Sequence, residues 1–173
     1  MSQIHGVPYE GSLQEAEQRG ETKLLWDSYN SDTYCRMAIE NAIKRNWDGS
    51  HLSSVGIMRV IREYGLERVE RLLANTIQKS GKDECFSEDN KEWAETIHVP
   101  EYKFHGYDLW REQILSSDPA LLNLTVNTVR KEREWRTEHE KEEKPSIRVQ
   151  LAIPKTPVAA VGEANRKYGR EER

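Results

Sequence analysis

Hydrophobic residues between positions 53 and 78 repeat at the spacing of two short amphipathic helices. The helix predicted over 53–64 is expected to bury residues three apart, Val55, Met58, Ile61 and Tyr64. The helix predicted over 67–78 is expected to bury one face, made of Val69, Leu72, Leu73, Thr76 and Ile77. Gly65 separates them, because glycine enters the left-handed C-cap conformation without a side-chain penalty. The pattern therefore predicts a helix–glycine–helix hairpin at the centre of the core.

Further helices are predicted on the N-terminal side of this hairpin. The pattern becomes helical at residue 13, and the segment 21–31 offers apolar side chains for burial. We expect Asp32 to be the N-cap of a separate helix over 33–46, because an aspartate accepts hydrogen bonds from the free amides of a first turn. Cys35 lies on the apolar stripe of that helix, so it is interpreted as a small core residue and not as a nucleophile.

On the C-terminal side, cap residues mark two more helices. Ser87 predicts a helix start, and residues 97–99 predict a brief strand. Residues 101–117 are interpreted as a connector followed by a short helix with four inward residues, Leu109, Trp110, Ile114 and Leu115. Asp118 and Pro119 are typical of the N-cap and first position of a helix. That helix is therefore expected to begin at this pair.

The last third of the chain changes character. Residues 119–130 keep a helical apolar stripe, whereas 130–144 are almost wholly charged, which predicts one helix over 119–144 with a projecting, solvated end. Residues 147–153 alternate with period two and give the strongest strand signal. Residues 154–173 are expected to form a basic, flexible tail. Such a tail can contact phosphate or an acidic partner, but the favoured interpretation is that it only keeps the chain in solution.

Together these elements predict a mainly α protein, a compact single-domain helical bundle around the helix–glycine–helix hairpin. At most a small β element is expected, at 97–99 and 147–153. Residues 1–12 are expected to be a loose N-terminus, and 13–153 the helical domain. With 36% hydrophobic and 32% charged residues, the chain has room for one modest core. Its net charge of −4 argues against a protein that coats nucleic acid along its whole surface.

Signals of catalysis, metal binding or membrane insertion are weak in this sequence. The two cysteines form no disulfide framework, and no apolar run reaches membrane-spanning length. His98 and His105 match no zinc spacing, and there is no glycine-rich phosphate loop or nucleophile elbow. We therefore expect a non-enzymatic cytosolic protein without cofactor or metal.

Two groups of residues are candidates for binding. Four arginines of the hairpin, together with three basic residues of the tail, could contact a phosphate backbone: Arg59, Arg62, Arg68, Arg71, Arg166, Lys167 and Arg170. Glutamates alternate with the hairpin arginines, so ion pairs on a solvated face explain them equally well. The charged helix contains one tryptophan that could anchor a protein partner with its neighbours: Trp135, Arg130, Arg133, Glu134 and Glu138.

Several segments also resemble a known family. They are CRMAIENAI at 35–43, DG at 48–49, IREYGLERV at 61–69, LANTIQ at 73–78 and NKEWA at 90–94. These motifs resemble a family of unknown function carried mainly on phages, plasmids and conjugative elements of Firmicutes, and the likeness covers residues 20–100. The family brings no established catalytic residues.

The resemblance implies that the chain is encoded on a mobile genetic element and acts in the cytoplasm of a bacterial host cell. Some proteins resembling this family look like anti-CRISPR inhibitors of type II effector nucleases. Such an inhibitor needs surfaces and no active site. The leading hypothesis is therefore a counter-defence protein that binds a CRISPR effector nuclease with its guide RNA. The alternative is a DNA-binding accessory or regulatory protein that uses the arginines of the hairpin.

Overall fold

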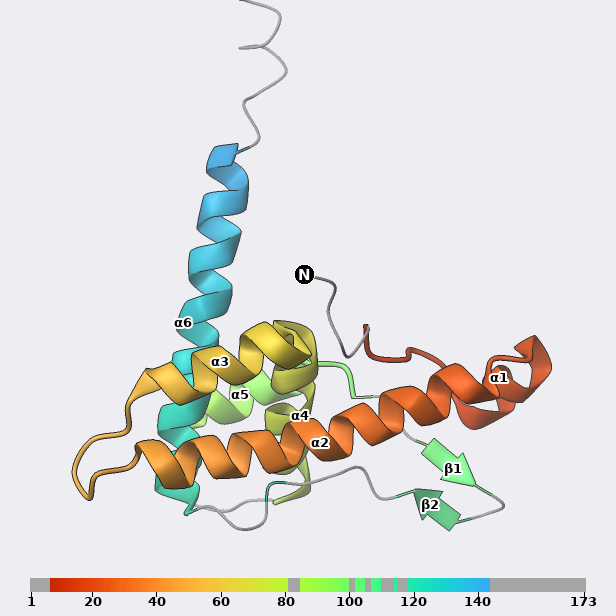
Figure 1. Ribbon diagram of the computed structural model, residues 1–173, viewed down its shortest axis with the longest axis horizontal. Coiled ribbons are helices and arrows are strands. Elements are labelled where there is room, and N and C mark those ends of the chain that lie inside the picture. Colours follow the sequence, from red (N-terminus) through yellow and green to blue (C-terminus); the bar gives the residue numbers. More distant parts are fainter. Residues whose placement is uncertain are drawn as a thin grey trace, which may run out of the picture. The chain divides into compact units, whose positions relative to one another are not determined.

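The computed structural model describes residues 7–80, 85–99, 102–104, 107–109, 114 and 118–143. The chain divides into two compact units, Met1–Thr137 and Glu138–Arg173, and only the helical residues 138–143 of the second are described. Figure 1 shows the elements of the described residues in chain order. They are α1 (Leu13–Arg19), α2 (Thr22–Asn46), α3 (Ser54–Tyr64), α4 (Leu66–Lys79), α5 (Glu88–Thr96), β1 (Tyr102–Phe104), β2 (Tyr107–Leu109) and α6 (Pro119–Glu143). The prediction of a mainly α fold is confirmed.

Helix α2 is one continuous helix of 25 residues where two segments were predicted. The expected N-cap at Asp32 is wrong, because this residue lies inside the helix and is 8% exposed. Its carboxylate accepts a hydrogen bond from the guanidinium of Arg68 on α4, so it does not bind the amides of a new helix start. The prediction that Cys35 is a core residue is confirmed, since this side chain is completely buried in the main core.

Helices α3 and α4 form the predicted hairpin, and α3 lies beside α2 (Figure 1). Gly65 joins them with φ 88° and ψ 145°, a positive φ that favours glycine, although it is not the left-handed helical conformation we expected. The buried face of α3 consists of Ile57, Val60, Ile61 and Tyr64. Val55 was predicted to be buried, but it is 62% exposed because the true stripe is offset along the helix.

Helix α4 is the centre of the core, and it is buried on more than the one face that we predicted. Eleven of its 14 residues are buried, including the charged residues Arg68, Glu70 and Arg71. It packs against α2, α3 and α5, and it is also joined to α6 by an ion pair between Glu70 and Arg133. The five residues predicted to face inward are all buried, but neighbouring helices cover the remaining sides as well.

The segment after α5 differs most from the prediction. Residues 97–99 form no strand. Ile97 is the C-cap of α5, and its carbonyl oxygen accepts a hydrogen bond from the side chain of Gln78, 3.2 Å away. The observed strands, β1 and β2, form an antiparallel pair with Lys103 opposite Asp108. Leu109 therefore lies in a strand and not in the predicted short helix. Ile114 is buried as predicted, whereas 110 and 115 lie outside the described residues.

Helix α6 begins as predicted. The side chain of Asp118 accepts a hydrogen bond from the backbone amide of Ala120 at 2.7 Å, and Pro119 is the first helical residue. Buried residues of α6 complete the main core, namely Leu122, Thr125, Val126 and Val129. The predicted strand at 147–153, the tail at 154–173 and residues 1–6 lie outside the described residues.

Candidate partner-binding groove

A groove of about 670 Å³ lies between the first part of α3, the turn that precedes it, and α6. Its lining residues all belong to the first structural unit: Ser50, His51, Leu52, Ser54, Met58, Leu124, Asn127, Thr128, Lys131, Glu132 and Trp135. This volume falls within the range of roughly 300–1,000 Å³ that is usual for binding pockets in proteins. The groove is therefore large enough to receive side chains of a partner.

One face of α6 supplies a full side of this groove. Leu124, Thr128, Lys131 and Trp135 follow one another at intervals of four, three and four residues, so they lie along the same face of the helix. Leu124 is 43% exposed and Trp135 is 54% exposed. The buried residues of α6 lie in its first part, so the groove face is a second surface of this helix, on which Leu124 and Trp135 are exposed apolar side chains.

The turn on the opposite side of the groove is held in shape by Asp48. Its Oδ1 accepts hydrogen bonds from the backbone amides of Ser50 at 2.8 Å and His51 at 2.7 Å, and from the hydroxyl of Ser50 at 3.0 Å. The bond from the His51 amide is the largest cause of a lowered pKa of the Asp48 carboxyl, followed by the bonds from Ser50. An antiparallel bridge between Trp47 and Leu52 closes the turn.

Two arginines fix α6 to the rest of the core. The guanidinium of Arg133 binds the carboxylate of Glu70 through two hydrogen bonds, of which the Nε–Oε1 bond is 2.9 Å. Arg130 donates a hydrogen bond through Nη1 to Oδ1 of Asn90 on α5, at 2.8 Å. Glu70 and Asn90 are both buried, so these contacts hold the register of α6, and with it the position of Trp135.

Among the described residues, Lys131 is the charged group of the groove that has no opposite charge bound to it. It is exposed, and among the described side chains it forms no ion pair. Glu132, by contrast, binds Nε of Arg136 at 2.7 Å. The groove therefore carries local positive charge, although the whole chain has a net charge of −4.

The residues predicted to bind a protein partner have separate positions. Trp135 lines the groove as the sequence suggested, but Arg130 and Arg133 are bound to side chains of the core. Glu134 and Glu138 are exposed and do not line the groove. The sequence analysis missed Leu124 and Lys131, whose spacing of 11 and four residues from Trp135 would have placed them on its face.

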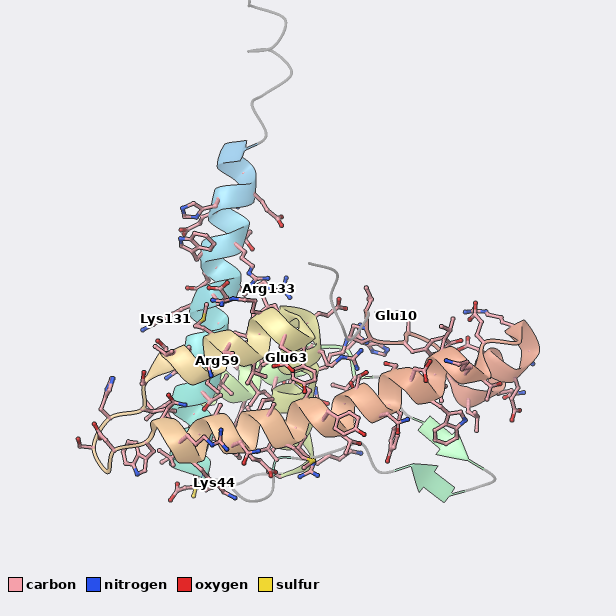
Figure 2. All side chains as sticks on the ribbon, viewed as in Figure 1. Glu10, Lys44, Arg59, Glu63, Lys131 and Arg133 are labelled. Atoms are coloured by element: carbon pink, nitrogen blue, oxygen red, sulfur yellow. The ribbon has the colours of Figure 1, made fainter. Side chains whose placement is uncertain are left out.

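The predicted arginine face of the hairpin is wrong for two of its four residues. Arg59 and Arg62 are exposed on α3, where Figure 2 labels Arg59. Arg68 is 1% exposed, and its Nη1 donates to the carbonyl oxygen of Ser28 at 2.9 Å as well as to Asp32.

Arg71 is also turned inward, and it binds Glu10 and, at 2.7 Å, Glu67. The alternative interpretation, ion pairs with the alternating glutamates on a solvated face, holds only for the Arg71–Glu67 pair. Arg68 pairs with Asp32 of α2, and neither arginine lies on a solvated face, because α4 lies in the middle of the core. Tail residues Arg166, Lys167 and Arg170 lie outside the described residues.

Side chains that could support other chemistry are dispersed. Within the described ranges, no three histidine, cysteine or acidic residues come together as metal ligands. The Cys35 side chain is buried and that of Cys85 is exposed, and burial raises the pKa of the Cys35 thiol well above its ordinary value. His98 is exposed, whereas His105 lies outside the described residues. None of the described helices is both long enough and apolar enough to span a membrane.

The profile of one protein family, described as "Protein of unknown function (DUF3849)", matches residues 8–134. The chain belongs to the DUF3849 family. This match extends beyond the resemblance found at 20–100, and it includes the groove residues as far as Glu132. Comparison with curated proteins gives no significant match, and neither does comparison with solved structures. The DUF3849 match assigns no function, so the link to phages and to CRISPR inhibition stays a prediction from sequence resemblance.

Proposed function

We propose that this DUF3849 protein is a non-enzymatic counter-defence protein of a mobile element. In this proposal it binds a type II CRISPR effector nuclease, loaded with its guide RNA, and blocks DNA recognition or cleavage. The observation that supports a binding role is Trp135, an aromatic side chain that is half exposed beside a groove on a helix anchored to the core. The choice of target comes from the sequence resemblance alone.

A half-exposed tryptophan of this kind is suited to protein binding. Tryptophan is enriched among the few interface residues that contribute most of the binding free energy. Because Arg133 fixes α6 against Glu70, the helix that carries Trp135 is held in place before a partner arrives, and less backbone order must be gained on binding.

The proposal is tested with purified protein in an RNA-guided DNA cleavage assay against type II effectors of Firmicutes. We expect inhibition when the protein is in molar excess, and co-elution with the loaded effector in size-exclusion chromatography. The variant Trp135→Ala should lose inhibition, whereas Tyr34→Ala should keep it, since Tyr34 is an aromatic residue with 58% exposure that does not line the groove. Cleavage that continues unchanged at large excess would reject the CRISPR target.

A second candidate function, DNA binding by an accessory or regulatory protein, is favoured by Arg59 and Arg62. Both are exposed on α3, and the described residues offer them no ion-pair partner. A gel shift at two salt concentrations tests this function. We expect the double variant Arg59→Ala and Arg62→Ala to reduce the salt slope by about one for each lost phosphate contact. Removing two exposed charges of α2, with Lys44→Ala and Arg45→Ala, is the matched control.

A further inference from the structure

We propose that the groove between α6 and the start of α3 is the docking site for an acidic amphipathic helix of a partner protein. This inference rests on the proposed binding function, and it adds the chemistry of the partner segment. It does not depend on which protein carries that segment.

The shape and the apolar residues of the groove favour a helix. Leu124 and Trp135 mark the two ends of the exposed face of α6, and at about 1.5 Å per residue they are roughly 16 Å apart along the helix axis. This length corresponds to about three turns of a partner helix. Leu52 and Met58 supply apolar contacts from the opposite side. An amphipathic helix that buries residues at i, i+3 or i+4, and i+7 fits such a surface.

The charge of the groove selects an acidic segment. Lys131 lies on the same face as Leu124 and Trp135, between them in the sequence, and is unbalanced among the described side chains. Glu132 is neutralised by Arg136 and would repel an acidic helix less than a free carboxylate. A partner that places an aspartate or glutamate opposite Lys131 would gain a charge pair beside an apolar contact, which improves specificity and association rate.

The same residues suit single-stranded nucleic acid less well. Proteins that bind single strands stack successive bases on several aromatic side chains and follow the backbone with a row of cations. The groove has one tryptophan and one lysine, together with a histidine, and its remaining lining is aliphatic or neutral apart from the paired Glu132. Figure 2 shows Lys131 on α6 and Arg59 on α3, and Arg59 is not part of the lining.

The groove is also preformed, since both of its sides are held by hydrogen bonds. Asp48 fixes the turn at Ser50 and His51, and Arg133 fixes α6 against Glu70. A preformed site loses little conformational entropy when it binds, so a short helix can be captured by a small surface.

The inference is tested by selecting a displayed library of about 15-residue peptides, patterned as amphipathic helices with random charged positions, on the full-length protein. We expect selected peptides to be rich in aspartate and glutamate on the wild type, and rich in lysine and arginine on the Lys131→Glu variant. A selected acidic peptide should bind Lys131→Glu about tenfold more weakly in fluorescence anisotropy. Lys141→Glu, which changes an exposed lysine outside the groove, should bind it as the wild type does.

Three outcomes would overturn the inference. In the first, the library yields no more bound peptide on the wild type than on a Leu124→Ala and Trp135→Ala double variant. In the second, the peptides selected on the wild type and on Lys131→Glu carry the same charge. In the third, the protein binds oligothymidine and not the peptides. Circular dichroism of each variant shows whether it is folded, and Lys131→Glu changes only an exposed side chain. In the parallel cleavage assay, inhibition that survives Lys131→Glu and Trp135→Ala rejects the groove and keeps the proposed function. Charge-dependent peptide selection without inhibition rejects the CRISPR target alone.

Discussion

The buried ion pair between Asp32 on α2 and Arg68 on α4 leads to the sharpest stability prediction. We consider three variants: Asp32→Leu, Arg68→Met and the double variant. Each single variant removes one side of this ion pair and leaves the other charged group in the core, where Arg68 keeps its hydrogen bond to the carbonyl oxygen of Ser28. The double variant replaces both groups with apolar side chains of similar shape.

The magnitude follows from burial. The Arg68 side chain is 1% exposed and that of Asp32 is 12% exposed, so solvent can do little to stabilise the group that remains. Breaking a buried pair by removing one partner typically costs about 3–5 kcal/mol, whereas replacing both partners with apolar residues is often close to neutral. We therefore expect each single variant to lose about 3–5 kcal/mol and the double variant to lose about 1 kcal/mol. Losses of this size are a large share of the stability of an ordinary domain, which is about 5–15 kcal/mol.

Urea unfolding followed by circular dichroism measures these free energies, and the double-mutant cycle isolates the coupling between the two side chains. The control cycle uses the surface pair Lys23–Asp27, whose residues lie four apart on the same helix and whose side chains are 86% and 57% exposed. Its coupling should stay below about 0.5 kcal/mol. Single core variants that each lose less than about 1 kcal/mol, or a double variant less stable than both, would contradict the reasoning.

Three further predictions concern other positions. Gly56→Ala should lower the free energy of unfolding by about 1–2 kcal/mol in urea titrations, because the added Cβ would clash with Nδ2 of Asn46, and Asn46→Ala should restore part of the loss. A thiol reagent should modify the exposed Cys85 quickly and the buried Cys35 only after unfolding, because burial raises the pKa of Cys35; rapid labelling of both in the native protein would contradict this. The pKa of the Asp48 carboxyl is lowered in the folded protein, so the stability that this carboxylate contributes is complete above pH 3.8, its ordinary pKa, and is lost as the pH falls further. The difference in melting temperature between wild type and Asp48→Ala should therefore narrow below pH 3.8.

The sequence correctly predicted the helix boundaries that are set by cap residues close to them along the chain. Asp118 and Pro119 start α6 as the sequence indicates, and Ser87 accepts a hydrogen bond from the amide of Asn90 at the start of α5. Gly65 separates α3 from α4 with a positive φ. In each case the decisive contacts lie within a few residues along the chain, so a single sequence contains the necessary information.

Predictions failed where a distant residue changed the local preference. Asp32 has a side chain typical of an N-cap, but its carboxylate accepts a hydrogen bond from Arg68, 36 residues away, and helix α2 continues through Asp32. Residues 97–99 have strand-forming side chains, but Gln78 binds the carbonyl of Ile97. Val55 follows the three-residue spacing of α3, yet it is 62% exposed because no other element of the described residues covers it. These outcomes depend on tertiary contacts that periodicity does not describe.

The candidate groove could be predicted only in part. Trp135 is conspicuous because it is the one large apolar residue in a charged run, and it is indeed exposed. The opposite side of the groove comes from Ser50, Leu52 and Met58, and only the packing of α3 near α6 brings them to the same place. Lys131 looks like any other solvated charge in the sequence. Its significance depends on which neighbouring charges are already paired.

The charged residues of α4 explain why the hairpin lies at the centre of the core. They also explain why its hydrophobic pattern predicted only one of the buried faces of α4. Arg68 binds α2, Arg71 binds the segment before α1, and Glu70 binds Arg133 of α6. Each of these charges therefore fixes a different element against the same helix, and a shift of that element by one turn would leave a charge buried without a partner. Because the contact to Arg133 also sets the register of α6, the position of Trp135 in the groove depends on Glu70 in the core. The interior of this DUF3849 protein thus determines the geometry of the surface through which we propose it acts.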